Sequence, residues 1–349
     1  MRCDIIIPVW NQLDATRECI DSIVDNTGYP YKLILIDNAS EKETADYLRS
    51  LKERLGGIAV IIRNDRNLGF AKAVNQGMKS SDAEYVCLMN NDTIAFAGWL
   101  TEMINIMKRS PDIGIMNPSS NTSGQFPGEL SIDEYAAGLK VFSGQTQELS
   151  VCRGFCMVIK KDVIKKIGYL DEIYDIGYFE ETDYCRRAAK ASYRMARAKG
   201  AYVYHKEGVS FKGRADSDAI FKKNEKIFTE RWGRPLKIGY FMGRPESAED
   251  VNKVALKTVK FGHQAVIFIK NSLAWPVEID HFDIRKEDAG PVFFRTVSFL
   301  KILKRRKKKK LDILITDSPL FSSVLKATRF FHKAEVFTSP FKGDIGRVP

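Results

Sequence analysis

Short runs of β-branched and aliphatic residues alternate with amphipathic stretches over the first part of this sequence. Such alternation is typical of βαβ units, in which helices connect the strands of a largely parallel sheet. A helical stripe of apolar residues separates the first two runs, and a short helix is predicted before the fourth. The strands are expected at residues 3–8, 32–37, 58–63, 84–89 and 113–118.

Polar residues follow four of these runs, at the point where each predicted strand ends. In open parallel sheets, ligands bind beyond the carboxyl ends of the strands. The sequence therefore predicts a nucleotide-sized site at one edge of the sheet. The polar strand ends are Pro8 to Asn11, Asp37 with Asn38, Arg63 with Asn64, and Asn90 to Asp92.

The following segment has a different character. Residues 120–150 are rich in Ser, Thr, Gly and Gln and have weak periodicity, so a long loop or mobile flap is expected there. A strand and a helix are predicted next, and then a helix that begins with Glu180, Glu181 and Asp183. The last strand of this part is expected to end at His205.

The net charge of +11 is unevenly distributed. Residues 235–349 hold 22 Lys and Arg against 12 Asp and Glu, a net of +10, whereas residues 1–234 hold 33 against 32. The change coincides with the linker-like segment RWGRPLK at residues 231–237. Because 349 residues with 44% hydrophobic content can form more than one core, we expect two domains, 1–234 and 235–349.

The six cysteines are scattered, without a CxxC pair or a His/Cys cluster at zinc-finger spacing. This usage favours reduced thiols in a cytosolic protein. The N-terminal MRCDIIIPVWNQ fits a first core strand better than a secretion signal. No apolar stretch approaches the ~18–20 residues that a membrane span needs, so any membrane contact is expected to be peripheral.

Two candidate regions for nucleotide binding allow alternative interpretations. Asp37 and Asn38 could form an Asx turn or cap the following helix, or Asp37 could accept a hydrogen bond from a base or ribose. Asn67 and Gly69 precede a predicted helix that carries Lys72. That arrangement suits either an ordinary turn, with Lys72 solvated, or anion binding at the helix N-terminus.

Asn90, Asn91 and Asp92 resemble the short acidic D-x-D metal motif of nucleotide-sugar enzymes, with Asn in place of the first Asp. A capping turn is the alternative. A single carboxylate is compatible with Mg²⁺ or Mn²⁺, because these ions are commonly held by one or two protein ligands together with substrate phosphates. His205 could be a structural strand-end histidine or a partner of such a site.

Glu180, Glu181 and Asp183 could simply complement the dipole at a helix N-terminus. The surrounding residues are aromatic and apolar, and they would desolvate a carboxylate and raise its basicity. The segment is therefore also a candidate for a general base.

The motifs PVWN, IDNAS, NLGFAKAVNQG, MNND, GYFEETDYCRR and VYH occur in this order over residues 3 to about 232. Together they resemble the family 2 glycosyltransferases, including the branch that resembles rhamnosyl- and galactofuranosyltransferases. The resemblance implies the GT-A fold, a Rossmann-like mixed, mostly parallel sheet flanked by helices. A smaller α/β domain is expected to follow it.

The resemblance implies roles by position. A divalent metal, Mn²⁺ or Mg²⁺, would be held by Asp92 and His205. Glu181 would be the general base, in place of the family's usual Asp, and Glu180 or Asp183 could share or take that role. Binding of the nucleotide-sugar is implied for Pro8, Asn11, Asp37, Asn38, Asn67, Gly69, Lys72, Asn90 and Asn91.

The implied reaction is an inverting, metal-dependent transfer of a sugar from a nucleoside diphosphate donor, with a UDP- or dTDP-sugar expected. The acceptor would be a glycan or a lipid-linked molecule, as in cell-surface polysaccharide synthesis. One alternative is a nucleotidyltransferase, although PVWNQLDATRE lacks the Gly-rich, basic phosphate loop expected after the first strand. Another is a sugar-nucleotide-binding protein whose metal site has decayed, as Asn90 would allow.

The basic last third again suggests βα units and resembles the beginning of a family 4 glycosyltransferase domain of the GT-B type. We expect an accessory domain without its own catalysis. The segment 293–310, FFRTVSFLKILKRRKKKK, could bind an anionic membrane surface or form a packed helix with a solvated basic end. Nucleic acid is not expected as a partner, because no recognition motif accompanies the basic cluster. A cytoplasmic location, peripheral at the inner face of the cell membrane, is expected.

Overall fold

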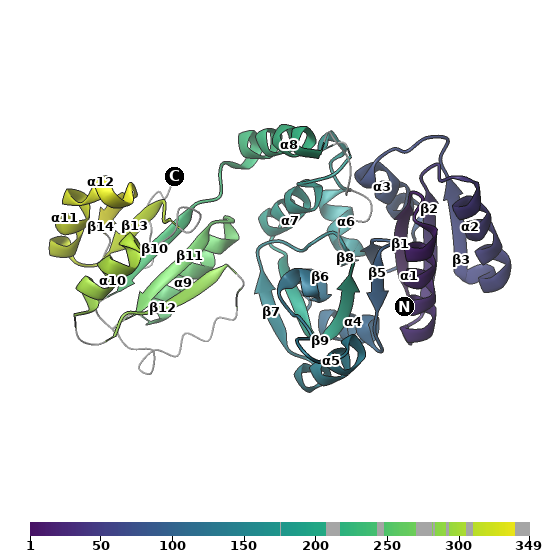
Figure 1. Cartoon of the computed structure of the whole chain (residues 1–349), viewed down its shortest axis with the longest axis horizontal. Helices are drawn as coiled ribbons and strands as arrows, with labels where there is room; N and C mark the ends of the chain where they lie inside the picture. The colour runs from purple at the N-terminus through teal and green to yellow at the C-terminus, as the bar shows by residue number, and fades with distance from the viewer. Residues whose placement is uncertain are drawn as a thin grey trace. The chain divides into compact units, whose positions relative to one another are not determined.

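The chain forms two compact units in a computed structural model, Met1–Gly233 and Arg234–Pro349 (Figure 1). The division falls within the segment RWGRPLK. The structure describes residues 1–174, 176–206, 217–242, 248–269, 281, 283–290, 293–304 and 310–338.

The first unit is built on a nine-stranded mixed sheet in the order β3-β2-β1-β4-β8-β6-β9-β5, with β7 paired to β9. The strands β3, β2, β1 and β4 are parallel to one another, and β8 is antiparallel to both of its neighbours. This is the mixed sheet flanked by helices that the sequence predicts. The strands are β1 (Cys3–Val9), β2 (Tyr31–Asp37), β3 (Ala59–Arg63), β4 (Tyr85–Met89), β5 (Thr93–Ala95), β6 (Ile113–Ser119), β7 (Thr146–Leu149), β8 (Cys156–Lys160) and β9 (Arg194–His205).

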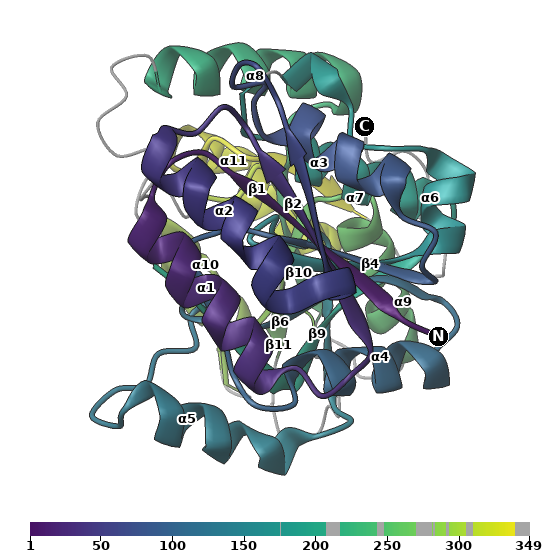
Figure 2. The same cartoon turned by 90° about the vertical axis from the view of Figure 1, so that its right-hand side faces the viewer.

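Helices cover both faces of this sheet (Figure 2). Successive side chains of a strand point to opposite faces, so Ile5 and Ile7 pack into one core and Ile6 into the other. All three are fully buried, as in a strand that is covered on both sides. One core includes α1 (Leu13–Asn26), α2 (Lys42–Leu55) and α4 (Trp99–Arg109), and the other includes α3 (Phe70–Ser80), α6 (Lys161–Ile167) and α7 (Glu180–Lys190).

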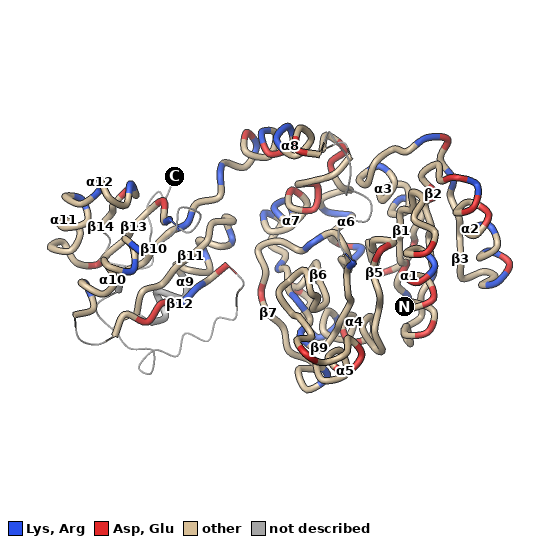
Figure 3. The backbone as a smooth tube through the Cα atoms, viewed as in Figure 1, with Lys and Arg blue, Asp and Glu red and all other residues tan. Residues whose placement is uncertain are grey.

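The exposed faces of these helices carry both signs of charge. Figure 3 shows Lys and Arg interspersed with Asp and Glu along α1 and α2. This agrees with the nearly balanced charge of residues 1–234. The final helix of the unit is α8 (Ser217–Trp232).

The expectation of a long loop over residues 120–150 is wrong, because this segment contains regular structure. The short helix α5 (Ile132–Gly138) begins with a capping box, in which Ser131 Oγ accepts from Glu134 N at 3.2 Å and Glu134 Oε2 accepts from Ser131 N at 2.9 Å. Strand β7 pairs antiparallel with β9. Two 3-10 turns, η2 (Asn121–Ser123) and η3 (Leu139–Phe142), flank α5.

The second unit contains a five-stranded parallel sheet in the order β12-β11-β10-β13-β14. Numbered within this unit the order is 3-2-1-4-5, which matches the first five strands of a doubly wound dinucleotide-binding sheet. Its resemblance to the family 4 glycosyltransferases stays a prediction. The elements are β10 (Lys237–Met242), α9 (Ala248–Lys260), β11 (Gln264–Ile269), β12 (Ile284–Asp288), α10 (Phe294–Leu303), β13 (Ile313–Thr316), α11 (Pro319–Ala327), α12 (Arg329–His332) and β14 (Glu335–Thr338).

Helix α10 corresponds to the apolar part of the predicted basic segment. Its residues Phe294, Ser298 and Ile302 are buried, and Phe294 and Ile302 belong to a core of the second unit. Of the basic run that follows, residues 305–309 lie outside the described residues. Within the described part of the chain, we find no helix with the length and apolar character needed to cross a membrane.

Candidate active site

A pocket of about 340 Å³ collects residues from six separate parts of the first unit. It includes four residues predicted from the sequence, Asn90, Glu180, Glu181 and His205. Their meeting follows from the fold, because β4 ends at Met89 and β9 ends at His205 on the same side of the site. The pocket is lined by Phe70, Asn90, Thr122, Arg153, Gly154, Phe155, Gly177, Tyr178, Glu180, Glu181 and His205.

Asp92 and His205 are brought together by strand pairing. Thr93 at the start of β5 lies opposite His205 at the end of β9, and Lys206 N donates to Asp92 O at 3.0 Å. As a result, Asp92 Oδ1 lies 3.1 Å from His205 Nε2. Asn90 Nδ2 lies 3.3 Å from the same ring nitrogen.

The Asp92–His205 pair has the chemistry of a divalent-cation site. Asp92 is 5% exposed, yet its Oδ1 makes no hydrogen bond to any described residue. A buried carboxylate oxygen without a donor, next to an imidazole nitrogen, fits an ion that completes its coordination with substrate phosphates. Among the described residues no group of three or more His, Cys, Asp or Glu could hold a metal ion alone.

Asn91 points away from this pair. Its Nδ2 donates to Thr16 Oγ1 in α1 at 2.9 Å, and the side chain is buried. Asn91 does not line the pocket. Within the MNND cluster, only Asn90 and Asp92 therefore lie beside His205.

A second group of predicted residues forms a hydrogen-bonded edge at the ends of β1, β2 and β3. Asp37 Oδ1 accepts from Ser40 N at 2.8 Å, and Asp37 Oδ2 forms an ion pair with Arg63. This turn bonds the backbone three positions after Asp37, one position beyond the predicted Asx turn, and Asp37 does not cap α2, whose N-cap is Glu41. The turn also shapes the chain near Asn11, because Ser40 Oγ accepts from Asn11 N at 2.9 Å.

Asn38 joins this edge to the segment before α3. Its Oδ1 accepts from Leu68 N at 3.1 Å, and its Nδ2 donates to Asn67 Oδ1 at 2.9 Å. Asn67 Oδ1 also accepts from Gly69 N at 2.9 Å. Gly69 has a φ of 81°, a conformation that favours glycine and turns the chain into Phe70, a lining residue of the pocket.

The other two predicted residues of this edge are less involved. Pro8 lies in β1 opposite Ile36, and Lys72 lies on α3; both are partly exposed. None of Pro8, Asn11, Asp37, Asn38, Asn67, Gly69 or Lys72 lines the 340 Å³ pocket.

Glu180 and Glu181 begin α7 and line the pocket. Glu180 is 6% exposed, and burial, together with the charge of Glu181, raises its pKa well above the usual value. Glu181 is partly exposed. Burial raises the pKa of Glu181 as well, although its own backbone N–H and the nearby Arg153 oppose this increase.

Asp183 lies in a different environment, although it belongs to the same helix turn. It is fully buried and accepts hydrogen bonds of 2.8 Å from Arg187 Nε, Arg231 Nη1 and Trp232 Nε1. Burial alone would raise the pKa of Asp183, but these hydrogen bonds hold it below the usual value. Asp183 does not line the pocket, and its contacts are those of a structural carboxylate.

Sequence reasoning missed Arg153 and Phe155, which lie just before β8. Phe155 is buried and stacks on His205 with ring centroids 5.2 Å apart. Asn117 in β6 fixes this segment, because its side chain accepts from Arg153 N at 2.7 Å and donates to Arg153 O at 2.9 Å. The available signal was the amide in the otherwise apolar run IGIMNP. Thr122 and Phe70 were likewise not predicted to line the site, whereas Tyr178 is one of the aromatic residues expected around the glutamates.

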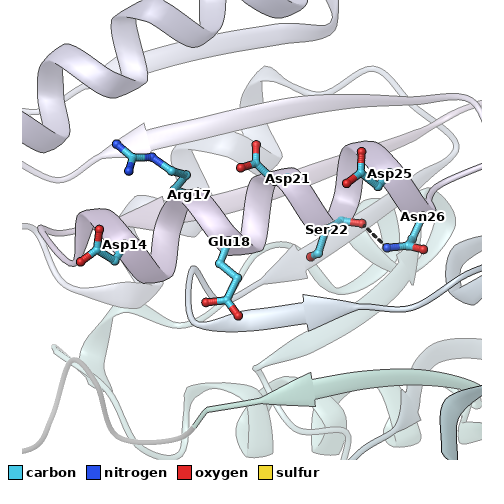
Figure 4. A pocket seen from close by; sticks show the side chains of 7 residues that line it. All are labelled: Asp14, Arg17, Glu18, Asp21, Ser22, Asp25 and Asn26. Atoms are coloured by element: carbon cyan, nitrogen blue, oxygen red, sulfur yellow. Dashed lines mark hydrogen bonds between the residues drawn. The ribbon is translucent and has the colours of Figure 1, made fainter. Parts of the chain in front are cut away.

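A second hollow runs along α1, and its lining residues all come from that one helix (Figure 4). The side chains project from the helix in several directions, and the hydrogen bond drawn between them runs from Asn26 Nδ2 to Ser22 O. Because no second element contributes a lining residue, this surface lacks the converging side chains of a catalytic pocket. It is lined by Asp14, Arg17, Glu18, Asp21, Ser22, Asp25 and Asn26.

The fold resembles two solved structures. "GalNAc-T7 with UDP, GalNAc and Mn2+" has a TM-score of 0.52 at 12% identity, covering 65% of this chain and 48% of that chain. S. aureus TarS, residues 1–349 in complex with UDP-GlcNAc, has a TM-score of 0.50 at 14% identity, covering 66% of each chain. At these identities the likeness concerns the fold alone, which is of the GT-A type.

The sequence comparisons identify a similar family, whereas the structural comparisons identify only the fold. The poly-beta-1,6-N-acetyl-D-glucosamine synthase of Staphylococcus aureus strain MSSA476 is 25% identical over 174 residues, covering 48% of this chain and 41% of the synthase. The chain spans less than half the length of the first curated relatives that it matches. Residues 4–168 match the sequence model described as glycosyl transferase family 2. This match covers just under half of the chain and lies within the first unit, which is therefore similar to the glycosyltransferases of family 2.

Proposed function

We propose that this chain is an inverting, metal-dependent glycosyltransferase that moves a sugar from a nucleoside diphosphate donor to a glycan or lipid-linked acceptor. The observation that carries this proposal is a single pocket that joins His205, the partner of Asp92, with the two glutamates Glu180 and Glu181. Asp92 and His205 have the chemistry to hold the diphosphate end of the donor. Glu180 and Glu181 have carboxylates that can accept a proton.

The donor proposed is a UDP- or dTDP-sugar. Asp37 and Asn38 lie at the carboxyl end of β2, where a base or ribose would bind in such a sheet. Asp37 already accepts from Ser40 and Arg63, but a carboxylate has about four acceptor sites and can take a further hydrogen bond. A relative that makes poly-N-acetylglucosamine and a structural neighbour that holds UDP-GlcNAc support a UDP-sugar.

Asp92 Oδ1 and His205 Nε2 would hold the divalent metal, Mn²⁺ or Mg²⁺. When bound, the metal stabilises the negative charge that develops on the leaving nucleoside diphosphate. Phe155 stacks on the His205 ring and limits its rotation. Asn90 Nδ2 is near enough to His205 to orient the ring or to contact the donor. The Mn²⁺ present in the GalNAc-T7 structure supports a metal in this fold.

Glu181 is the proposed general base. The acceptor O–H proton moves to a Glu181 carboxylate oxygen while the acceptor oxygen bonds to the anomeric carbon. The bond from that carbon to the diphosphate oxygen breaks, and its electron pair leaves with the nucleoside diphosphate. A single displacement inverts the anomeric carbon, as in inverting sugar hydrolysis.

Two observations favour Glu181 over its neighbours. Glu180 is 6% exposed, whereas Glu181 is partly exposed and is therefore more accessible to an acceptor hydroxyl. Asp183 is committed to Arg187, Arg231 and Trp232. Arg153 stabilises the charged form of Glu181, which is the form that can accept a proton.

We also propose that α10 contacts an anionic membrane surface, where a lipid-linked acceptor would be found, at the inner face of the cell membrane. Phe293, Leu300 and Leu303 are exposed apolar residues at one end and along one side of this helix. Lys304 and Lys310 border the basic run. Sedimentation with anionic liposomes tests this, and equal binding after neutralisation of Lys307 to Lys310 would contradict it.

The activity is tested by measuring nucleoside diphosphate release from a panel of donors with Mn²⁺ or Mg²⁺. Release that requires metal and acceptor supports the proposal. Donor binding without release would instead favour a decayed sugar-nucleotide-binding protein. Pyrophosphate formation from a nucleoside triphosphate and a sugar phosphate would identify a nucleotidyltransferase.

A further inference from the structure

The turn that leads into α7 has an unusual backbone conformation. Tyr178 and Phe179, the two residues before Glu180, have φ values of 72° and 76°. Two consecutive non-glycine residues rarely adopt this left-handed region, because their side chains crowd the backbone. Such a conformation persists only where surrounding contacts hold it.

Asn224 on α8 provides these contacts. Its side chain is fully buried, and its Nδ2 lies 2.5 Å from Tyr174 O, 2.7 Å from Gly177 O and 3.4 Å from Tyr178 O. One amide group therefore faces three carbonyl oxygens of the segment that precedes the glutamates. The three carbonyls lie 46 to 50 positions away from Asn224 in the sequence.

Aromatic packing from the same helix holds the side chains of the turn. Phe221 contacts the rings of Tyr178 and Phe179, with centroids 5.4 and 5.3 Å apart. Phe228 is buried and its ring lies 5.2 Å from that of Phe179. Tyr178 Oη also shares a hydrogen bond of 2.8 Å with Ser217 Oγ. Helix α8 thus holds both left-handed residues through backbone and side chain.

We propose that Asn224 is a positioning residue, which keeps the turn at residues 177–179 in its left-handed form and so directs Glu180 and Glu181 into the pocket. This inference rests on the proposed function for the role of the glutamates. The geometry itself does not depend on it. Neither Asn224 nor any other residue of α8 lines the pocket, so its effect is transmitted through the turn.

The change that tests this is Asn224→Asp, which keeps the side-chain shape but replaces the amide donor with an acceptor that faces three carbonyls. Glu225→Gln, at the exposed neighbouring position, is the matched control. In Asn224→Asp we expect kcat to fall by at least ~10-fold while the KM for the donor changes by less than ~2-fold, because misplacement of a reacting group affects the chemical step. Because a loss of folded protein would also lower the apparent kcat and leave KM unchanged, kcat is calculated per folded enzyme, with the folded fraction measured by circular dichroism.

A second measurement does not need activity. Hydrogen–deuterium exchange of peptides that cover residues 176–183 should increase in Asn224→Asp and stay unchanged in Glu225→Gln. Phe228→Leu, which loses the contact with Phe179 but keeps an apolar side chain, is expected to give a smaller change in the same direction. This variant decides the question if Asn224→Asp does not fold.

The inference is overturned if exchange at 176–183 is unchanged in both Asn224→Asp and Phe228→Leu, or if a folded Asn224→Asp turns over at the wild-type rate. A wild-type protein that releases no nucleoside diphosphate would instead contradict the proposed function, and the exchange comparison would still report whether Asn224 holds the turn.

Discussion

The Asp92 carboxylate and the His205 imidazole lie 3.1 Å apart, although 113 positions separate them in the sequence. The antiparallel pairing of β5 with β9 creates this contact. Apart from this contact, Asp92 Oδ1 makes no hydrogen bond to a described residue, so the carboxylate is available to the divalent ion that we propose.

We therefore expect Asp92→Asn and His205→Ala to lower metal-supported turnover by ~100-fold or more, since the metal supplies several kcal/mol of transition-state stabilisation. Calorimetry should show weaker Mn²⁺-dependent binding of the nucleoside diphosphate in both variants. Asp133→Asn, a change at an exposed carboxylate on α5, serves as the control. Equal turnover in Asp92→Asn and the wild type would show that this carboxylate takes no part.

Glu181→Gln is expected to reduce kcat by ~10²–10⁴-fold, the usual contribution of a general base. Burial raises the pKa of Glu181, and the base must be deprotonated to act. The rate should therefore rise with pH through this raised pKa, and the acidic limb of the kcat/KM profile should lie above pH 4.5, the ordinary glutamate value. Glu180→Gln is the matched comparison, with a smaller loss expected. A larger loss in Glu180→Gln would exchange the two roles.

Some features of this fold are determined by the local sequence pattern, and others by tertiary contacts. Strands β1, β2 and β4 are apolar on both faces, and the predicted ends agree with the observed ones to within one residue. Strand β7 reads TQEL and lies partly exposed, so no apolar pattern marked it.

The same distinction applies to the site. Asn90, Glu180, Glu181 and His205 were found because each lies at the end of a strand or the start of a helix. The sequence could not separate Glu181 from Asp183, because the difference depends on partners that lie 48 and 49 positions later on α8. Arg153 was missed because its position depends on Asn117, 36 residues earlier.

Asp183→Asn is expected to destabilise the first unit by about 3 kcal/mol, the lower end of the range for a broken buried ion pair, because both arginine partners reach solvent. The hydrogen bonds from its arginine and tryptophan partners hold the folded-state pKa of Asp183 below the ordinary aspartate value of 3.8. Its stabilisation is therefore fully present above pH 3.8 and is lost as the pH falls through the lowered folded-state value.

Urea unfolding at several pH values would measure this difference. The gap between wild type and Asp183→Asn should be constant near neutral pH and shrink below about pH 3.8. Asp162→Asn removes an exposed pair with Lys165, so it should change the unfolding free energy by less than ~0.5 kcal/mol. A gap that grew on acidification would contradict the assigned role of Asp183.

Gly77 in α3 allows this helix to approach β1 closely. A Cβ added at Gly77 would lie 2.4 Å from Ile6 Cγ2, which is buried in the sheet. We expect Gly77→Ala to destabilise the first unit by about 1–3 kcal/mol, since overpacking of a filled core outweighs the gain of ~1 kcal/mol in helix propensity. The movement of α3 should also weaken nucleotide binding, because α3 begins directly after Gly69.

Gly138→Ala is the matched control, because a Cβ there meets nothing within 4 Å and φ is −63°. That change should stabilise the protein by about 0.4–1 kcal/mol, and a stabilising Gly77→Ala would show that the helix does not pack as closely on Ile6 as the structure indicates.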